Sequence, residues 1–588
     1  MKPTTDWRLL WRCFLYLAPF KAVLIGIYGS MVLINLVQLI IPLLLRWGID
    51  EGIYGNDLGL LARAVGFIML ATLVKGVLVY YQGVWSESSS QSVAYFLRGE
   101  LLAALGRLSF SFHDEMEAGQ ILSRAMQDVE RIRFLTGRAI LRLIEGALLI
   151  LSIAVVLLVM NSTLALLILL TVPFLVHRAY IFGRQIRPLS VDIQQQLGVL
   201  TTTLEQNLRG ARVVKSFAQE EKEIAQFAEQ NEQWYEIAEK TARVQALNAP
   251  LLDVIANFGT VFIFWYGGWL VTQDQLTLGE LVAFTTYLAQ LVRPIRLIGR
   301  IIPILAIAAS AGERIFSILD QQPTVRSRPD ASQLPAIRGE VRFENVAFAY
   351  PDSREVLEDI DFTAAPGQII ALMGATGSGK TTLVHMLARF HDPTRGRVTI
   401  DGMDLQEITL DSLRQQIGFV MQDSVLFAAT VRENITFGRP DASEAEIIQA
   451  AKDAQAYEFI SQMPNGFDTY VGEQGVTLSG GQKQRLAIAR TLITNPRILV
   501  LDDATSSVDT RTEQLIQKAL DRLMEGRTTF IIAHRLSTVQ RADRILLLER
   551  GRMVAFGTHA EILASSPLYQ QIEALQVQRA TQGDEHEL

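Results

Sequence analysis

Cysteine is nearly absent from this chain of 588 residues, whose only thiol is Cys13. One cysteine closes no internal disulfide and builds no cysteine metal site, so neither is expected. An excess of positive charge is also missing, because 54 Lys and Arg residues face 61 Asp and Glu residues, a net charge of −7. Without a basic surface the chain is not expected to bind nucleic acid. The N-terminal region carries no cleavable signal pattern, and residues 7–16 are instead amphipathic, as an interfacial helix would be.

Long apolar runs, by contrast, are abundant. Six of them occupy residues 20–47, 60–84, 138–160, 162–184, 247–272 and 277–309. Crossing a hydrocarbon core of ~30 Å takes about 20 apolar residues, and each run is long enough. So many runs of this length do not suit the buried helices of a soluble core. The sequence therefore predicts a lipid membrane as a partner and an α-helical domain with six spans.

The connections between these runs alternate in character. Those near residues 48–58, 160–162 and 273–275 are short and lack clustered Lys and Arg. The stretches 85–137 and 185–246 are long, polar and rich in charged residues, and we expect them to continue the spans as helical hairpins. Because positive residues favour the inner side, the long stretches and both termini are predicted to be cytoplasmic, at a plasma (inner) membrane that the chain crosses several times.

The second half of the chain carries a glycine-rich phosphate motif. Residues 374–381, Gly-Ala-Thr-Gly-Ser-Gly-Lys-Thr, fit G-x-x-x-x-G-K-[ST]. An apolar strand pattern at 368–373 precedes the motif and a helix pattern begins at Thr382, as the motif requires. In such a loop, which we call the cradle, backbone N–H groups surround phosphates, Lys380 adds positive charge and the hydroxyl of Thr381 reaches Mg²⁺. The sequence therefore predicts a nucleotide and Mg²⁺ as ligands.

A second apolar strand pattern, at 497–501, ends in Asp502. P-loop enzymes use a carboxylate at the end of a buried strand on the Mg²⁺ side of their site, so Asp502 is predicted to bind the metal. The strands and the helix between them predict an α/β P-loop domain.

From about residue 338 to 575 the chain resembles the nucleotide-binding domain of an ATP-binding cassette (ABC) transporter. Residues 478–482, Leu-Ser-Gly-Gly-Gln, are similar to the ABC signature, which in the family contacts the γ-phosphate of an ATP held by the opposite domain. The chain has one copy of the cradle and one of the signature, so the resemblance implies half of a dimer. A membrane domain followed by its ATPase in one chain is the order of ABC exporters.

The resemblance implies roles for residues outside the cradle, all in the family's order. Tyr350 would stack on adenine, Gln422 would lie near Mg²⁺, and His534 would contact the γ-phosphate. The implied nucleotide-binding set is Tyr350, Gly374, Thr376, Gly377, Ser378, Gly379, Lys380, Thr381, Thr382, Ser479, Gly480, Gly481, Gln482 and Asp509; the metal set is Thr381, Gln422 and Asp502; the catalytic set is Asp503, His534 and Gln422.

One position departs from the family pattern. After the Mg²⁺ aspartate the family usually has a glutamate that polarises the attacking water, whereas this chain has Asp503. Aspartate is one methylene shorter, so its carboxylate falls short by roughly 1 Å, and such a displacement can cost on the order of 10²-fold in rate. We expect a site that binds ATP but hydrolyses it slowly, in a heterodimer with a second ABC half-transporter whose own site works faster. The alternative is a homodimer in which a shifted water lets Asp503 work adequately.

The expected domains follow from these patterns. They are an amphipathic interfacial helix at 1–18, a membrane domain at 19–312, a linker at 313–337, the nucleotide-binding domain at 338–575 and a polar tail at 576–588. By resemblance, one coupling helix lies in residues 112–123 and another near residues 205–216.

Lys75 lies well inside the second span, where a charge is costly and suggests a function, so it is the candidate for the substrate cavity. Amphipathic drugs, peptides and lipids all suit an apolar cavity with a basic group. The expected function is ATP-driven export by alternating access, with ATP hydrolysis coupled to transport. A lipid flippase, and an ATP-gated channel or regulatory subunit with a slow ATP site, are the alternatives.

Overall fold

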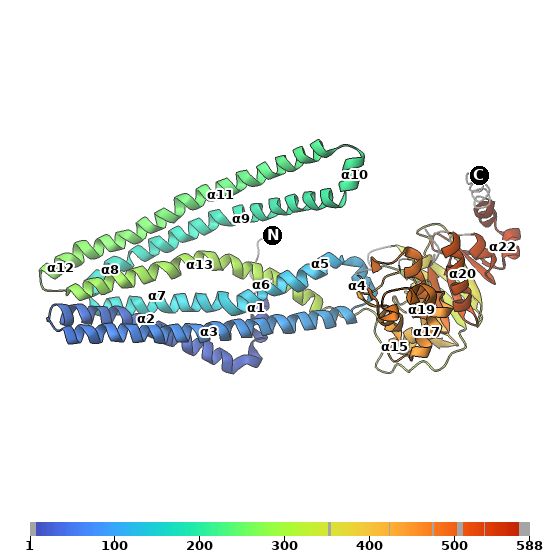
Figure 1. Cartoon of the computed structure of the whole chain (residues 1–588), viewed down its shortest axis with the longest axis horizontal. Coiled ribbons are helices and arrows are strands. Elements are labelled where there is room, and N and C mark those ends of the chain that lie inside the picture. Colours follow the sequence, from blue (N-terminus) through green and yellow to red (C-terminus); the bar gives the residue numbers. More distant parts are fainter. Residues whose placement is uncertain are drawn as a thin grey trace. The chain divides into compact units, whose positions relative to one another are not determined.

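The structure, a computed structural model, describes residues 7–350, 354–422, 424–472, 475–502, 510–533 and 536–574. The chain divides into two compact units: Met1–Arg107 with Met116–Gln321, and Leu108–Glu115 with Gln322–Leu588. The described part of the first unit contains helices and no strand, whereas the second combines helices with β-strands (Figure 1). This agrees with the predicted fold class, in which a helical membrane domain is fused to an α/β domain.

The first unit is built from long helices joined by short turns and one-turn irregular segments. Its helices include α1 (Trp7–Leu15), α2 (Lys21–Trp47), α3 (Leu58–Arg107), α6 (Val129–Phe134), α7 (Ile140–Met160), α8 (Ser162–Leu169), α9 (Thr171–Arg209), α11 (Glu220–Phe262), α12 (Gly268–Thr272) and α13 (Leu278–Leu319). The shorter segments are η1 (Ala18–Phe20), η2 (Gly48–Ile53), α5 (Ala118–Ser123), η3 (Arg124–Asp128), η4 (Leu135–Ala139), α10 (Ala211–Ser216) and η5 (Ile263–Gly267).

Five continuous helical stretches in the described residues are long and apolar enough to cross a membrane. They are Ala18–Ile53, Leu58–Arg107, Ala118–Met160, Ser162–Arg209 and Glu220–Thr272. The sixth predicted span lies in α13, whose segment Leu278–Val292 is an apolar helix. α13 continues to Leu319, so the helix extends past residue 312, where the expected membrane domain ends.

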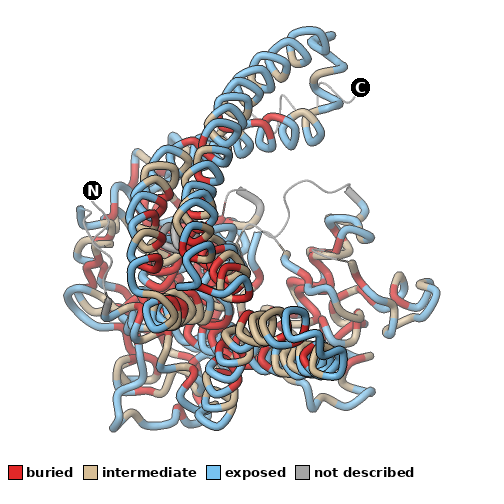
Figure 2. The backbone as a smooth tube through the Cα atoms, turned by 90° about the vertical axis from the view of Figure 1, so that its left-hand side faces the viewer, coloured by how far each residue is buried: buried red, intermediate tan, exposed pale blue. Residues whose placement is uncertain are grey.

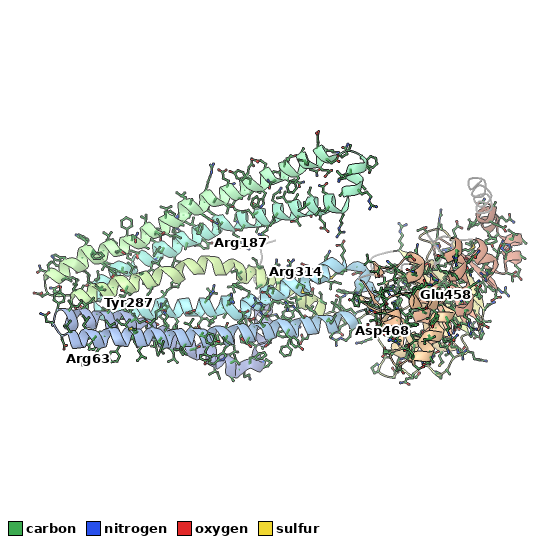
Figure 3. The ribbon with its side chains drawn as sticks, in the orientation of Figure 1. Arg63, Arg187, Tyr287, Arg314, Glu458 and Asp468 are labelled. Atoms are coloured by element: carbon green, nitrogen blue, oxygen red, sulfur yellow. The ribbon has the colours of Figure 1, made fainter. Side chains whose placement is uncertain are left out.

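Polar side chains inside the first unit find partners across helices. Tyr287 of α13 is fully buried, and its hydroxyl donates a hydrogen bond to the carbonyl of Leu39 in α2. Asp128 is buried in η3 and accepts at 2.6 and 2.7 Å from Arg314 of α13, the residue labelled in Figure 3. These contacts satisfy polar groups that would otherwise be costly to bury, and they join the last long helix to earlier ones.

α9 and α11 lie side by side as a hairpin whose tip is α10 (Figure 1). Thr203 of α9 donates to Gln230 of α11 at 2.7 Å. No residue of α10 is buried, and most of the outer part of the hairpin is exposed (Figure 2). The long polar stretch 185–246 therefore continues two spans as helices, as the sequence predicted.

The second unit is organised around a ten-stranded sheet of order β5-β4-β1-β2-β12-β11-β3-β10-β9-β6. Its strands are β1 (Val341–Ala349), β2 (Glu355–Ala364), β3 (Ile369–Met373), β4 (Arg395–Ile400), β5 (Met403–Asp404), β6 (Ile417–Val420), β9 (Ile498–Asp502), β10 (Thr528–Ile532), β11 (Arg544–Glu549) and β12 (Arg552–Gly557). A separate pair consists of β7 (Ala429–Thr430) and β8 (Tyr470–Val471).

The middle of the sheet, from β11 through β3, β10 and β9 to β6, is parallel. Every residue of β10 is buried, as expected for a parallel strand covered on both faces. The covering and flanking helices are α4 (Phe110–Glu115), α14 (Lys380–Leu387), α15 (Leu410–Gln415), α16 (Val431–Ile435), α17 (Glu444–Asp453), α18 (Tyr457–Ser461), α19 (Gly480–Thr494), α20 (Thr510–Met524), α21 (Leu536–Gln540) and α22 (His559–Ser565). The carboxyl ends of the parallel strands share one edge, and this edge positions the candidate site.

Candidate nucleotide-binding site

The cradle joins β3 to the first residue of α14. Gly374 and Gly379 have φ of +150° and +101°, a region that residues with a side chain rarely adopt. A Cβ at Gly379 would lie 2.6 Å from Cδ2 of Leu357, so glycine is needed there for space as well as for conformation. Thr376, Gly377 and Thr381 are exposed on the rim, where a ligand can reach them.

Lys380 lies inside this loop. Its Nζ donates to the carbonyls of Gly374 and Ala375 at 2.8 and 3.0 Å, and the residue is 7% exposed. Burial lowers the pKa of Lys380, and the nearby carboxylate of Asp502 opposes that shift. The hydroxyl of Ser378 is buried without a hydrogen-bond partner among the described residues. A buried cation beside a glycine loop and an unsatisfied hydroxyl form a site that fits the phosphates of a nucleotide.

Tyr350 follows β1 and is partly buried against the core of the sheet. Its hydroxyl lies 3.2 Å from Oγ1 of Thr382, the third residue of α14. Its ring meets that of Phe348 edge to face, with centroids 4.9 Å apart. The predicted adenine-stacking tyrosine is therefore linked directly to the helix that carries Lys380.

The predicted metal residues come from neighbouring strands. Asp502 ends β9 and pairs in register with Ile532 of β10. Gln422 follows β6, whose Val420 pairs with Leu501, and its side chain is exposed. Since Leu372 of β3 also pairs with Ile532, the cradle, Asp502 and Gln422 all follow strands that end at the same edge.

The signature forms the start of α19. Ser479 is the N-cap: its hydroxyl accepts from the N–H of Gln482 at 3.3 Å, and the side chain of Gln482 accepts from the N–H of Ser479 at 3.0 Å. This capping box holds the turn in shape, while Ser479 and Gly480 remain exposed and Gly481 is buried. An exposed helix N-terminus of this kind attracts anions. Asp503, Asp509 and His534 lie outside the described residues.

Comparison with known proteins agrees with this arrangement. The family model described as the ABC transporter transmembrane region matches residues 24–295, and the one described as ABC transporter matches residues 357–506. An uncharacterised ABC transporter ATP-binding protein of Bacillus subtilis, YknU, is 38% identical over 567 residues, which cover 96% of this chain and 97% of that protein. The chain belongs to the ABC transporter family.

Two further matches bear on the type of ABC transporter. An ATP-dependent lipid A-core flippase of Syntrophus aciditrophicus is 37% identical over 518 residues, or 88% of this chain and 86% of that protein. A solved bacterial Atm1-family ABC exporter with ATP bound has a TM-score of 0.79 at 31% identity, covering 95% of this chain and 99% of that one. This ABC chain is thus an exporter-type half-transporter, a multi-pass membrane protein whose ATP hydrolysis is coupled to transport. Half-transporters of this type work as dimers.

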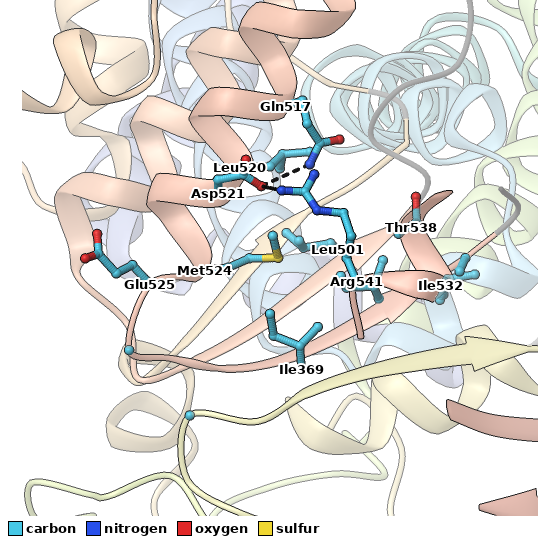
Figure 4. A pocket seen from close by; sticks show the side chains of 14 residues that line it. Ile369, Leu501, Gln517, Leu520, Asp521, Met524, Glu525, Ile532, Thr538 and Arg541 are labelled. Atoms are coloured by element: carbon cyan, nitrogen blue, oxygen red, sulfur yellow. Dashed lines mark hydrogen bonds and ion pairs between the residues drawn. The ribbon is translucent and has the colours of Figure 1, made fainter. Parts of the chain in front are cut away.

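A cavity of about 470 Å³ in the second unit extends along the central strands beneath α20, from the start of β3 and the turn before β10 to the last residues of β9 and β10, with Thr538 of α21 in its wall (Figure 4). Leu501 and Ala533, which directly precede Asp502 and His534, are among its lining residues. At its mouth Arg541 pairs with Asp521 at 2.7 Å. The cavity was not anticipated from the sequence, because its walls come from segments that are distant in the chain.

Lys75, the candidate for the substrate cavity, lies on α3 and is partly exposed. The side chains around it on the same helix are exposed and apolar, including Leu73, Val74 and Val77. No ion pair with Lys75 occurs among the described residues. The first unit therefore presents this cation on an apolar face.

Sequence reasoning missed one group of residues beside the cradle. Phe110, His385 and His391 bring their rings together next to Tyr350. The only sequence signal was that the two histidines closely follow Lys380, and nothing local connects them to Phe110.

Proposed function

We propose that each ATP is held between the cradle of one chain and the signature of a second half-transporter, and that this closure drives export. The observation that carries the proposal is the combination found in one chain: a cradle built around buried Lys380, an exposed signature at the start of α19, and a fused unit of membrane helices. The cradle offers one side of an ATP and the signature N-terminus offers another anion site, so two chains would complete two sites.

Mg²⁺ fits the same edge of the sheet. Thr381, Asp502 and Gln422 would hold it together with nucleotide oxygens and water, since Mg²⁺ usually binds through one or two carboxylates and substrate phosphates. Within the described ranges no group of three His, Cys, Asp or Glu side chains could hold a metal alone, which suits an ion that arrives with the nucleotide. Bound there, Mg²⁺ would neutralise phosphate charge.

Asp503 would make ATP hydrolysis slow at this chain's own site, because its side chain is shorter than that of glutamate. Asp503, His534 and Gln422 would act on the γ-phosphate and the attacking water, and Asp509 would take part in nucleotide binding. The shorter Asp503 favours a heterodimer, because the intact signature of this chain would serve a partner site that turns over normally. Mg-ATPase activity of the purified chain, measured without a partner, tests this pairing: slow turnover supports the heterodimer, and robust turnover supports a homodimer.

Amphipathic molecules are the proposed cargo, taken from the cytoplasm or the inner leaflet. Lys75 on an apolar face of α3 would contact the polar group of such a substrate. Lipids are a specific candidate because several relatives, including that of Syntrophus aciditrophicus, are named lipid A-core flippases. Drugs and peptides of mixed polarity are the other members of this class.

Transport assays separate these activities. In proteoliposomes, ATP-dependent movement of fluorescent phospholipids between leaflets supports a flippase, and ATP-dependent accumulation of an amphipathic dye supports a drug exporter. An ATP-gated channel would release a preloaded dye down its gradient without accumulating it.

The proposed orientation places both termini and the ATPase on the cytoplasmic side of the inner membrane. We propose the domain limits at 19–312, 313–337 and 338–575, with the interfacial helix before them and the polar tail after. Cysteine-accessibility labelling tests the orientation in a Cys13→Ser background. Glu51→Cys should react with an impermeant maleimide from outside, whereas Glu229→Cys should react only after permeabilisation.

A further inference from the structure

α4 begins with an aromatic residue that packs in the same compact unit as the sheet. The segment Leu108–Glu115 belongs to this unit, and Ser109 anchors it by accepting a hydrogen bond from the N–H of Val325 at 2.9 Å. The next residue, Phe110, stacks on Phe390 with ring centroids 4.9 Å apart and an angle of 13°. α4 is thus held by ring packing beside the nucleotide-binding sheet.

His391 continues these ring contacts toward the candidate ATP site. Its centroid lies 6.2 Å from that of Phe110 and 5.3 Å from that of Tyr350, with angles of 83° and 81°. Edge-to-face pairs at such separations are attractive. Among the described ring pairs, His391 is the only ring that contacts both Phe110 and Tyr350. It is 5% exposed, and its Nε2 has no hydrogen-bond partner among the described residues, so packing holds the ring.

Phe110 also contacts α14, the helix that follows the cradle. His385 of α14 meets Phe110 edge to face at 5.3 Å and is 8% exposed. α14 begins at Lys380, and Tyr350 reaches the same helix through Thr382. Phe110 therefore contacts the helix of the phosphate site directly and the predicted adenine-stacking ring through His391.

We infer that His391 is a positioning residue that couples occupancy of the adenine side of the ATP site to the position of α4. The inference rests on the role proposed above for Tyr350. A base stacked on Tyr350 fixes the orientation of the Tyr350 ring. Because the interior is densely packed, the neighbouring ring of His391 must shift when the Tyr350 ring shifts. His391 transmits the constraint to Phe110, and thereby to the segment that leads into α5 of the first unit.

Coupling between two sites is reciprocal at equilibrium. If ATP constrains Phe110 through His391, changes at Phe110 must alter ATP affinity, although Phe110 is not part of the candidate ATP site. An edge-to-face ring pair contributes enough for its loss to weaken ATP binding about two- to tenfold. A purely structural role would lower the folded fraction and leave the affinity of the folded molecules unchanged.

The test is equilibrium binding of radiolabelled ATP to the full chain in lipid nanodiscs. We expect His391→Leu and Phe110→Leu each to raise the Kd about two- to tenfold, and the double variant to show no further increase. His391→Phe keeps a flat ring in the same place and should restore the wild-type Kd. Phe112→Leu is the matched control on α4, because among the described rings Phe112 pairs only with His113.

The outcomes separate this inference from the proposed site. If Tyr350→Leu raises the Kd while His391→Leu and Phe110→Leu do not, the coupling is overturned and the adenine site stands. If Tyr350→Leu has no effect, the adenine role fails and the inference fails with it. Additive effects of His391→Leu and Phe110→Leu would also contradict coupling through one residue. If His391→Leu fails to fold, Phe110→Leu and His391→Phe carry the test.

Discussion

Replacing Lys380 by methionine is the most direct perturbation of the cradle. Methionine keeps an unbranched apolar stem in a position that is 7% exposed, so the packing of α14 should survive while the charge is lost. Nζ donates to two loop carbonyls, at 2.8 and 3.0 Å, from a site where burial lowers its pKa. The cation is therefore desolvated, and water screens its attraction for phosphate very little.

The size of the effect follows from this burial. A hydrogen bond to a charged group contributes about 1.5–3 kcal/mol, which corresponds to roughly 10- to 150-fold in Kd. We expect Lys380→Met to weaken ATP binding by at least about tenfold, measured by titration of the full chain with labelled ATP. Lys452→Met, an exposed lysine on α17 of the same unit, is the matched control and should leave the Kd unchanged. An unchanged Kd for Lys380→Met, with the protein folded, would refute the assignment of the cradle.

Three further predictions concern hydrolysis, pH and the signature. Asp503→Glu should raise the ATPase rate by up to about 10²-fold if the shorter carboxylate limits the reaction, and an unchanged rate would remove that account. Burial lowers the pKa of His385 and His391 in the folded chain, and Asp114 opposes this shift. Below about pH 6.5 the unfolded chain therefore binds more protons than the folded chain. Thermal stability should be flat above that pH and decline below it, and the decline should be shallower in His391→Phe. Ser479→Ala removes the N-cap of α19 and should cost about 1 kcal/mol in thermal or urea unfolding, whereas Ser479→Asp should largely keep the cap.

The sequence was most informative where chemistry demands a local residue pattern. The cradle needs glycines at positive φ followed by lysine at the start of a helix, and Gly374, Gly379 and Lys380 lie as the motif requires. The membrane spans could also be predicted from the sequence, because length and apolar character alone decide whether a helix can cross a bilayer.

Side-chain contacts between segments that are distant in the chain correspond to no local pattern in the sequence. His391 packs against Phe110 and Tyr350, residues far from it in the chain, and no periodicity relates the three. Gln482 is a different case: its side chain closes a capping box with Ser479, a local contact that the spacing Ser-x-x-Gln encodes, and the nucleotide contact indicated by the signature stays a prediction. The ring contacts of His391, in contrast, depend on tertiary packing, which single-sequence patterns do not encode.

On the proposed function, ATP held by this chain drives net movement of an amphipathic cargo across the membrane. This can be measured in inside-out vesicles from cells that express the chain in its native setting, where any partner half-transporter is present, with a fluorescent phospholipid and an amphipathic dye as probes. We expect ATP-dependent movement of at least one probe out of the cytoplasmic leaflet or medium, and we expect Lys380→Met to reduce this movement while Lys452→Met leaves it unchanged. Equal movement with and without ATP, or in wild-type and Lys380→Met vesicles, would contradict it.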